Sequence, residues 1–229
     1  MNEKATLPAA VLWDMDGTLI DSEPYWIEAE IELAARFGIA WTHEDGLTLV
    51  GNPLTVSAQV MIDRGVDLPP GDIIDYLLTR VTARVRERTP WQDDARDLLD
   101  AVVSAGIPCA LVTMSYAMLA DAFVSRAPDA FAVVVSGDQV THGKPHPEPY
   151  LVAAERLGVP IDRCVAIEDS PAGVGSAHAS GAATIGVRRL APIEARPGLT
   201  RVRSLAGLDV AALGRLVDGD VIDELGADS

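Results

Sequence analysis

The sequence is poor in basic residues, in cysteine and in long apolar runs. Its 229 residues include 18 Lys and Arg against 34 Asp and Glu, and the formal net charge is −16. A surface of that sign repels nucleic acid and anionic membranes, because both are polyanions. We therefore expect neither nucleic acid nor membrane as a partner, and an anionic substrate would need a local cation to receive it.

The apolar runs are also too short for a membrane-spanning helix. The strongest of them, residues 11–13 and 109–112, fall far below the roughly 20 residues that a bilayer requires. Residues 1–10 carry one lysine and no apolar stretch of the kind found in a secretory signal. We expect a cytoplasmic protein.

The two cysteines, Cys109 and Cys164, each lie in an apolar run. They lack the C-x-x-C or Cys/His spacing that is typical of metal and redox sites. Free cysteine in such surroundings behaves as a small buried hydrophobic residue. We expect two reduced thiols with no chemical role.

Beyond residue 90 the sequence alternates short apolar runs with helical patterns, which is typical of βαβ units and a parallel sheet. The runs are nearly continuous in Val, Ile, Leu, Ala and Cys, as expected for strands covered on both faces. The predicted strands are 10–14, 107–113, 131–136, 164–168 and 183–187, and the predicted helices between them are 95–105, 118–125, 147–157 and 173–180. The fold class predicted is α/β, with a Rossmann-like doubly wound parallel sheet.

Residues 22–88 interrupt this alternation, because they contain helical patterns and no convincing strand. Apolar residues recur at helical spacing in 26–37, 54–62 and 73–85. We interpret the interval as an inserted helical cap subdomain. The predicted division is residues 1–20 and 90–229 for the α/β core and 21–89 for the cap.

The strongest chemical signal is Asp14-Met15-Asp16-Gly17-Thr18, which follows the apolar run Val11-Leu12-Trp13 directly. Two carboxylates two residues apart at a strand end project toward the same side, where open α/β sheets bind ligands. Such close like charges require either a metal between them or a proton on one of them. A plain Asp-Gly turn is the common alternative. A calcium loop is excluded, because that pattern requires Gly at its sixth position and Leu19 stands there.

Two further signals follow in order. Thr113, Met114 and Ser115 end the run Cys-Ala-Leu-Val, and they offer hydroxyl and backbone N–H groups to phosphate oxygens. Lys144 lies in the rigid loop Gly-Lys-Pro-His-Pro, where a point cation could meet a phosphate. A P-loop is excluded by the spacing of its glycines and by the proline after the lysine.

A second pair of acids, Glu168 and Asp169, closes the apolar run Cys-Val-Ala-Ile. An Asp there could simply cap the next helix. Oxygen ligands from Asp14 and Asp169, together with a backbone carbonyl, waters and substrate, suit the octahedral shell of Mg²⁺. The sequence therefore predicts a magnesium site between two strand ends.

These motifs together resemble the haloacid dehalogenase superfamily, in particular its capped branch of phosphatases and β-phosphoglucomutase-like hexose-phosphate mutases. The resemblance covers nearly the whole chain, and its motifs lie at 14–22, 113–115, 144–150 and 168–173.

The resemblance implies that Asp14 is the nucleophile and Asp16 the general acid and base. Thr113 and Lys144 would hold the phosphoryl group, with Met114 and Ser115 beside it. The metal ligands implied are Asp14, Asp169 and the main-chain carbonyl of Asp16, with Glu168 as the other acid of that motif. The reaction implied is Mg²⁺-dependent hydrolysis of a small-molecule phosphate ester through an aspartyl-phosphate.

Dehalogenases and phosphonate-cleaving relatives lack an acid at the position of Asp16, so both activities are disfavoured. Mutases place a His where this chain has Trp26 and an Arg just past the position of Gly51, where Asn52 stands here. A cation that would grip a second phosphate is thus missing, and we favour a hydrolase over a mutase. A third hypothesis is a non-catalytic binding protein on the same fold. The chain also departs from its relatives at Asp93-Asp94, where they carry Pro-Gly.

Overall fold

Six short strands form one parallel sheet in the computed structural model, which describes residues 7–226. Every residue of the three central strands is buried, which accounts for their continuous apolar character. The strands are β1 (Ala10–Trp13), β2 (Cys109–Val112), β3 (Val133–Val135), β4 (Cys164–Glu168), β5 (Ala183–Val187) and β6 (Thr200–Val202).

The strand order is β3-β2-β1-β4-β5-β6, and all neighbouring pairs are parallel. Successive residues of β1 face opposite sides of the sheet. Val11 and Trp13 join the apolar cluster with α5 (Asp93–Ser104), α6 (Ala117–Val124) and α9 (Val210–Val217). Leu12 joins a second cluster with α7 (Glu148–Leu157) and α8 (Pro171–Ser180). The predicted doubly wound α/β fold is confirmed.

β1 lies at the point where the order of strands reverses, with β2 on one side and β4 on the other. Ligands of open α/β sheets bind beyond the carboxyl ends of the strands at such a point. The residues that follow β1, β2 and β4 therefore share one edge of the sheet.

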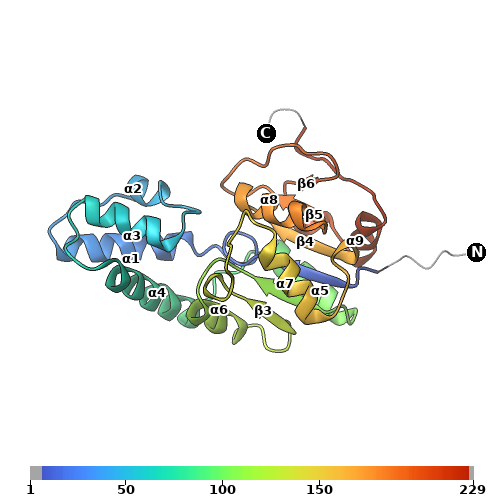
Figure 1. Cartoon of the computed structure of the whole chain (residues 1–229), viewed down its shortest axis with the longest axis horizontal. Coiled ribbons are helices and arrows are strands. Elements are labelled where there is room, and N and C mark those ends of the chain that lie inside the picture. Colours follow the sequence, from blue (N-terminus) through green and yellow to red (C-terminus); the bar gives the residue numbers. More distant parts are fainter. Residues whose placement is uncertain (1–6, 227–229) are drawn as a thin grey trace, which may run out of the picture.

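Four helices between β1 and α5 form a separate helical lobe, at the left of Figure 1. They are α1 (Glu23–Arg36), α2 (His43–Leu47), α3 (Leu54–Asp63) and α4 (Pro70–Glu87). The two connections to this lobe lie side by side, since the Asp21 N–H donates to the Pro90 carbonyl at 2.8 Å. Ile20 and Trp91 form an isolated antiparallel bridge next to that contact. α4 also packs against α6 of the core, which anchors the lobe.

The predicted strands 164–168 and 183–187 match β4 and β5. The other three predicted strands are one to three residues longer in total than β1, β2 and β3. Of the α-helices and strands in the described residues, three were not predicted: β6, the five-residue α2, and α9. β6 lacks the apolar pattern of the other strands, because Arg201 stands at one of its three positions. Arg201 is buried, and its guanidinium donates to the Ile193 carbonyl at 2.9 Å. α2 depends on a capping box between Thr42 and Asp45 more than on an apolar face.

Cys109 and Cys164 are free and buried, which confirms the prediction of unpaired thiols. Burial raises the pKa of both thiols to about 11, so neither is a thiolate at neutral pH. Within residues 7–226, none of the helices has the length and apolar character needed to cross a membrane.

Candidate active site

Asp14 directly follows β1, and its carboxylate meets the ammonium group of Lys144. Lys144 Nζ donates to Asp14 Oδ1 at 2.7 Å and to the Val112 carbonyl at 2.8 Å, and it lies 2.6 Å from Glu168 Oε1. Each of the three ammonium hydrogens thus has an acceptor. The side chains of both Lys144 and Asp14 are less than a tenth exposed. The lysine is therefore the internal counter-ion of the site.

Glu168 and Asp169 stand at the end of β4, next to Asp14. Both Glu168 oxygens are held by the protein: Oε1 accepts from the Tyr150 hydroxyl at 2.8 Å, and Oε2 accepts from the Ser170 hydroxyl at 3.3 Å. Asp169 Oδ1 accepts from the Thr18 hydroxyl at 3.2 Å. Glu168 thus positions its neighbours, whereas Asp169 keeps an oxygen that faces Gly17.

The electrostatics of this cluster are unbalanced, because three buried carboxylates share one ammonium group. Burial and the charge of Glu168 raise the pKa of Asp14 to about 7. Burial, followed by the charges of Asp14 and Glu168, raises the pKa of Asp169 well above its ordinary value. Burial alone would lower the pKa of Lys144, but the two carboxylates outweigh that effect and raise it. Without a bound cation, one ammonium group therefore faces three carboxylates, and the raised pKa values show that protons would have to offset the remaining charge.

A divalent cation fits this charge excess and the donor atoms present. One oxygen from each of Asp14, Glu168 and Asp169 lies within 4.8 Å of the others. Asp14 Oδ2 is buried and has no hydrogen-bond partner in the structure. An unpaired buried carboxylate oxygen costs free energy unless a cation or donor meets it. Carboxylate oxygens are the ligands that Mg²⁺ prefers, so the residues fit a magnesium ion.

Asp16 faces a separate group of hydroxyls, although it was also named as a metal residue from the sequence. Its Oδ1 accepts from the Ser22 hydroxyl at 2.5 Å, and its Oδ2 accepts from Thr113 at 3.3 Å and from Ser115 at 2.8 Å. Its side chain does not belong to the carboxylate cluster formed by Asp14, Glu168 and Asp169. This leaves only its main-chain carbonyl for the metal role that the resemblance implies.

Thr113, Met114 and Ser115 follow β2 and close the site on that side. Thr113 Oγ1 accepts from the Ser115 N–H at 2.9 Å, which makes a tight turn at the strand end. Met114 Sδ accepts from the Lys144 N–H at 3.0 Å, so the methionine side chain supports the lysine loop. All four predicted substrate-binding residues, these three and Lys144, line the same cavity.

Gly17 is required where it stands, and we expect Gly17→Ala to destabilise the protein. Its φ is +90°, and a Cβ there would collide with the carboxylate of Asp169. Gly38 has a similar φ of +71° with nothing within 4 Å, so Gly38→Ala is a matched control for backbone strain alone. In urea unfolding, Gly38→Ala should lose about 1 kcal/mol, and Gly17→Ala roughly 2–4 kcal/mol because the collision adds to the strain. Equal losses would contradict this close approach.

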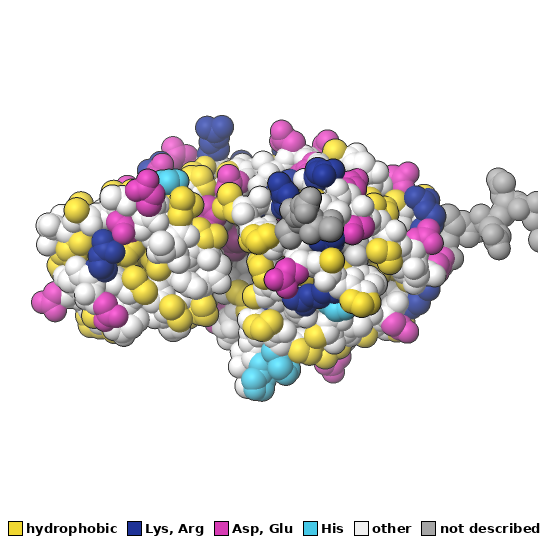
Figure 2. Space-filling model, turned by 90° about the horizontal axis from the view of Figure 1, so that it is seen from above, with side chains coloured by type: hydrophobic (Ala, Val, Ile, Leu, Met, Phe, Trp, Pro, Cys, Tyr) yellow, Lys and Arg dark blue, Asp and Glu magenta, His cyan; other side chains and the backbone are white. Residues whose placement is uncertain are grey.

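A cavity of about 970 Å³ lies between the core and the helical lobe and contains the predicted site residues Asp14, Asp16 and Asp169. Figure 2 shows the waist between the two lobes, with acidic side chains at the crevice. The lobe contributes Trp26, and Gly51 to Thr55 line the wall as well. Tyr25, the neighbour of Trp26, is not among the lining residues, and its hydroxyl donates to the Arg88 carbonyl.

The sequence analysis missed three acids and one cation on the cavity wall: Asp21, Glu23, Glu30 and Arg189. Asp21 lies within the first motif and Glu23 directly follows it, but nothing in the pattern indicated that they line a cavity, and Glu30 and Arg189 lie outside every motif. Among the described residues, the basic side chains that line the cavity are those of Lys144 and Arg189. The lobe side of the cavity is therefore acidic.

Asp94, at the unusual Asp-Asp segment, holds Arg189 in place. Its Oδ1 accepts from Arg189 Nη2 at 2.6 Å, and its Oδ2 accepts from the Ser204 hydroxyl at 2.6 Å and the Leu205 N–H at 2.8 Å. Burial opposes ionisation of Asp94, but these donors outweigh it and lower its pKa to about 2. Asp94, which stands where relatives carry Pro-Gly, thus connects the start of α5 to Arg189 on the cavity wall.

Glu30 is buried in the lobe, where its Oε2 accepts from Trp41 Nε1 at 3.3 Å. Burial raises the pKa of Glu30 from 4.5 to about 7, and the charge of Glu23 adds to the shift. The folded protein therefore holds a proton that the unfolded chain has released. The free energy of unfolding accordingly falls as the pH rises from about 4.5 to 7, by up to roughly 3 kcal/mol from this group.

We expect Glu30→Gln to remove that part of the pH dependence, because the amide keeps the acceptor for Trp41 and carries no charge. Urea unfolding at pH 4 and pH 8 measures it. The variant should match the wild type at pH 4 and exceed it in stability at pH 8. Equal stability of the two proteins at pH 8 would show that Glu30 ionises freely.

Comparison with known proteins identifies the family of the chain. Residues 11–187 match the family described as haloacid dehalogenase-like hydrolase. The chain is 32% identical over 187 residues to the fructose-1-phosphate phosphatase YqaB of Escherichia coli, covering 80% of this chain and 97% of that protein. It is 33% identical over 218 residues to hexitol phosphatase A of the same organism, covering 92% and 96%.

Solved structures show the same architecture. CbbY from Rhodobacter sphaeroides in complex with phosphate superimposes with a TM-score of 0.78 at 28% identity, covering 90% of this chain and 99% of that one. A substituted form of that protein has been solved with xylulose-(1,5)bisphosphate. A phosphate ester is thus the ligand chemistry of a structural relative.

Proposed function

The chain belongs to the haloacid dehalogenase-like hydrolase family, and we propose that it is a Mg²⁺-dependent phosphatase that hydrolyses a small sugar phosphate through an aspartyl-phosphate on Asp14. The observation that carries this proposal is the buried carboxylate of Asp14. One of its oxygens is paired with Lys144, the other is buried without a hydrogen-bond partner, and the residue lines a large cavity. A carboxylate held in this way is poised both to ligate a cation and to attack phosphorus.

In the first step the Asp14 carboxylate attacks phosphorus in line with the ester oxygen. The new Asp14 O–P bond forms as the P–O ester bond breaks, and the leaving alkoxide takes a proton from the Asp16 carboxyl. In the second step Asp16 accepts a proton from water, whose oxygen attacks phosphorus and releases inorganic phosphate and free Asp14. The hydroxyls of Ser22, Thr113 and Ser115 hold Asp16 in place for both transfers.

Two groups supply positive charge. Lys144 lies beside Asp14 Oδ1 and lowers the repulsion between the carboxylate and an incoming phosphate. Mg²⁺ held by Asp14 and Asp169, with the Asp16 carbonyl, would neutralise charge on the phosphoryl oxygens. Together they offset the net charge of −16, which would otherwise repel an anionic substrate.

The helical lobe serves as a cap over the site in this proposal, with the boundaries near residues 21 and 89. The cavity between the lobes is lined from both of them, so a bound substrate would contact the lobe with its leaving group and the core with its phosphate. Closure of such a lobe excludes bulk water from the reacting atoms.

The charges of the cavity favour a leaving group without a second phosphate. Lys144 and Arg189 are already paired, with Asp14 and Asp94, and the other wall carries Glu23 and Glu30. Hydroxyl groups of a neutral sugar or polyol can donate to such carboxyls, whereas a second phosphate would find no unpaired cation among these residues. The named relatives that act on fructose 1-phosphate and hexitol phosphates support this class.

A matched pair of substrates tests the proposal. With Mg²⁺, the protein should release phosphate from fructose 1-phosphate with a kcat/KM at least about tenfold higher than from fructose 1,6-bisphosphate, a difference of about 1.4 kcal/mol in transition-state binding. Colorimetric phosphate release measures both. Inactivity toward all members of a sugar phosphate panel would favour a non-catalytic binding protein on this fold.

The alternative of a hexose-phosphate mutase makes a different prediction. With β-glucose 1-phosphate and a trace of the 1,6-bisphosphate, a mutase forms glucose 6-phosphate faster than it releases phosphate. We expect the reverse, because the lobe presents Trp26 and Asn52 to the cavity where mutases carry cationic or ionisable side chains.

A further inference from the structure

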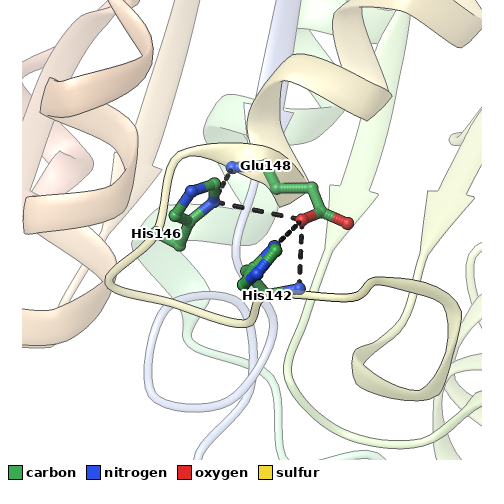
Figure 3. Close-up of side chains that lie close together, drawn as sticks. All are labelled: His142, His146 and Glu148. Carbon is green, nitrogen blue, oxygen red and sulfur yellow. Dashed lines mark hydrogen bonds and ion pairs between the residues drawn. The ribbon is translucent and has the colours of Figure 1, made fainter.

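Two histidines and a glutamate gather on the surface of the loop that carries Lys144. His142 Nδ1 lies 2.7 Å from Glu148 Oε2, and His146 Nδ1 lies 4.0 Å from the same oxygen. The two imidazole centroids are 4.6 Å apart. Figure 3 shows the three side chains converging from one turn of the chain, and Figure 2 shows histidine side chains projecting from the surface of the larger lobe. The proposed phosphatase chemistry uses none of them.

We propose that His142, His146 and Glu148 form a surface binding site for a late first-row transition-metal ion such as Zn²⁺, separate from the magnesium site. One candidate ligand atom from each residue lies within 4.8 Å of the other two. Tetrahedral Zn²⁺ with bonds of about 2.0–2.1 Å separates its ligand atoms by roughly 3.4 Å, which lies between the two distances to Glu148. Small rotations of exposed side chains therefore suffice to close the site.

His146 can offer an imidazole nitrogen to a metal. The Glu148 backbone N–H donates to His146 Nδ1 at 3.2 Å, and a metal at this nitrogen would replace that hydrogen bond. Unprotonated imidazole nitrogen is the form that ligates Zn²⁺, Ni²⁺ and Cu²⁺. Two imidazoles and one carboxylate select such ions over Mg²⁺, which prefers an all-oxygen shell.

The backbone of the loop is already held in place. Glu148 starts α7, and its Oε1 accepts from the Thr141 N–H at 2.7 Å while its Oε2 accepts from the His142 N–H at 3.0 Å. Prolines at 145, 147 and 149 further restrict the loop. Little conformational entropy remains to be lost when the ligands converge, and the exposed face leaves coordination positions for water.

The test compares two double variants that remove the same number of imidazoles from the four histidines of the chain. His142→Gln with His146→Gln removes the proposed ligands, and His43→Gln with His178→Gln is the matched control. Tag-free full-length protein is titrated with Zn²⁺ in a calorimeter at saturating Mg²⁺, which occupies the carboxylate cluster. Thermal melts verify that both variants are folded.

We expect one Zn²⁺ site in the wild type and in the control. Loss of an outer-shell partner alone costs about 10- to 100-fold in metal affinity, so loss of two ligands should weaken this site by at least about 100-fold. Electron paramagnetic resonance of bound Cu²⁺ should show nitrogen couplings that vanish in the His142/His146 variant. Equal Zn²⁺ affinity in the two double variants, or a Cu²⁺ spectrum without nitrogen couplings, would overturn the site and leave the phosphatase proposal untouched.

Discussion

Asp14→Asn should abolish phosphate release from sugar phosphates, by about four orders of magnitude or more, because an amide cannot attack phosphorus. Asparagine keeps the size of the side chain and an oxygen acceptor for Lys144 Nζ, so the geometry of the site should persist. The measurement is kcat/KM with Mg²⁺ for fructose 1-phosphate. Acid-quenched reactions with labelled substrate should show a covalent phosphoenzyme in the wild type and none in the variant.

Two controls separate loss of the nucleophile from loss of the fold. Asp93→Asn makes the same change at an exposed residue of α5 and should leave the activity unchanged. The melting temperature of Asp14→Asn should not fall, because burial and Glu168 raise the pKa of Asp14 to about 7 and removing its charge relieves repulsion. An active Asp14→Asn protein would end the proposal of an aspartyl-phosphate.

Lys144→Met should produce the largest loss of stability of any single change at the site. The ammonium group of Lys144 contacts both Asp14 and Glu168, and the lysine side chain is 5% exposed. Breaking a buried ion pair by removal of one partner costs about 3–5 kcal/mol, because a buried charge is left uncompensated. Urea unfolding at pH 8 measures this loss, with Arg163→Met, which removes an exposed surface pair, as the control.

The loss should depend on pH and on Mg²⁺ in a defined direction. Without the ammonium group the carboxylates are harder to ionise in the folded protein than in the unfolded chain. The folded state then binds more protons, so the variant loses stability as the pH rises above about 4 and approaches the wild type below it. Saturating Mg²⁺ should restore about 3 kcal/mol at 100 times its Kd. A loss that is independent of both pH and Mg²⁺ would place the role of Lys144 in packing alone.

The parallel sheet, most of its strands and the chemistry of the strand ends could be predicted from the residues, whereas the order of the strands could not. The continuous apolar runs of β1, β2 and β4 indicated strands buried on both faces, and the acids directly after them indicated a site at the sheet edge. β6 escaped prediction because a buried Arg201 interrupts its apolar pattern, and that arginine is satisfied by distant groups at Ile193 and Asp223.

The pairing within the site required the folded chain. Lys144 and Asp14 are 130 residues apart, and no local pattern indicates that the ammonium contacts Asp14 and Glu168 together. The need for glycine at 17 likewise arises from the approach of Asp169, which directly follows β4. Long-range contacts of this kind depend on the order of strands in the sheet.

The residues along the chain thus established which chemical groups are present, that they follow buried strands, and the family they resemble. The folded protein established which oxygen is left unpartnered, which carboxyls have raised pKa values, and that Glu23 and Glu30 line the cavity. The physical reason is that side-chain identity and periodicity are local properties. Burial and charge pairing depend instead on distances between segments that meet only in three dimensions.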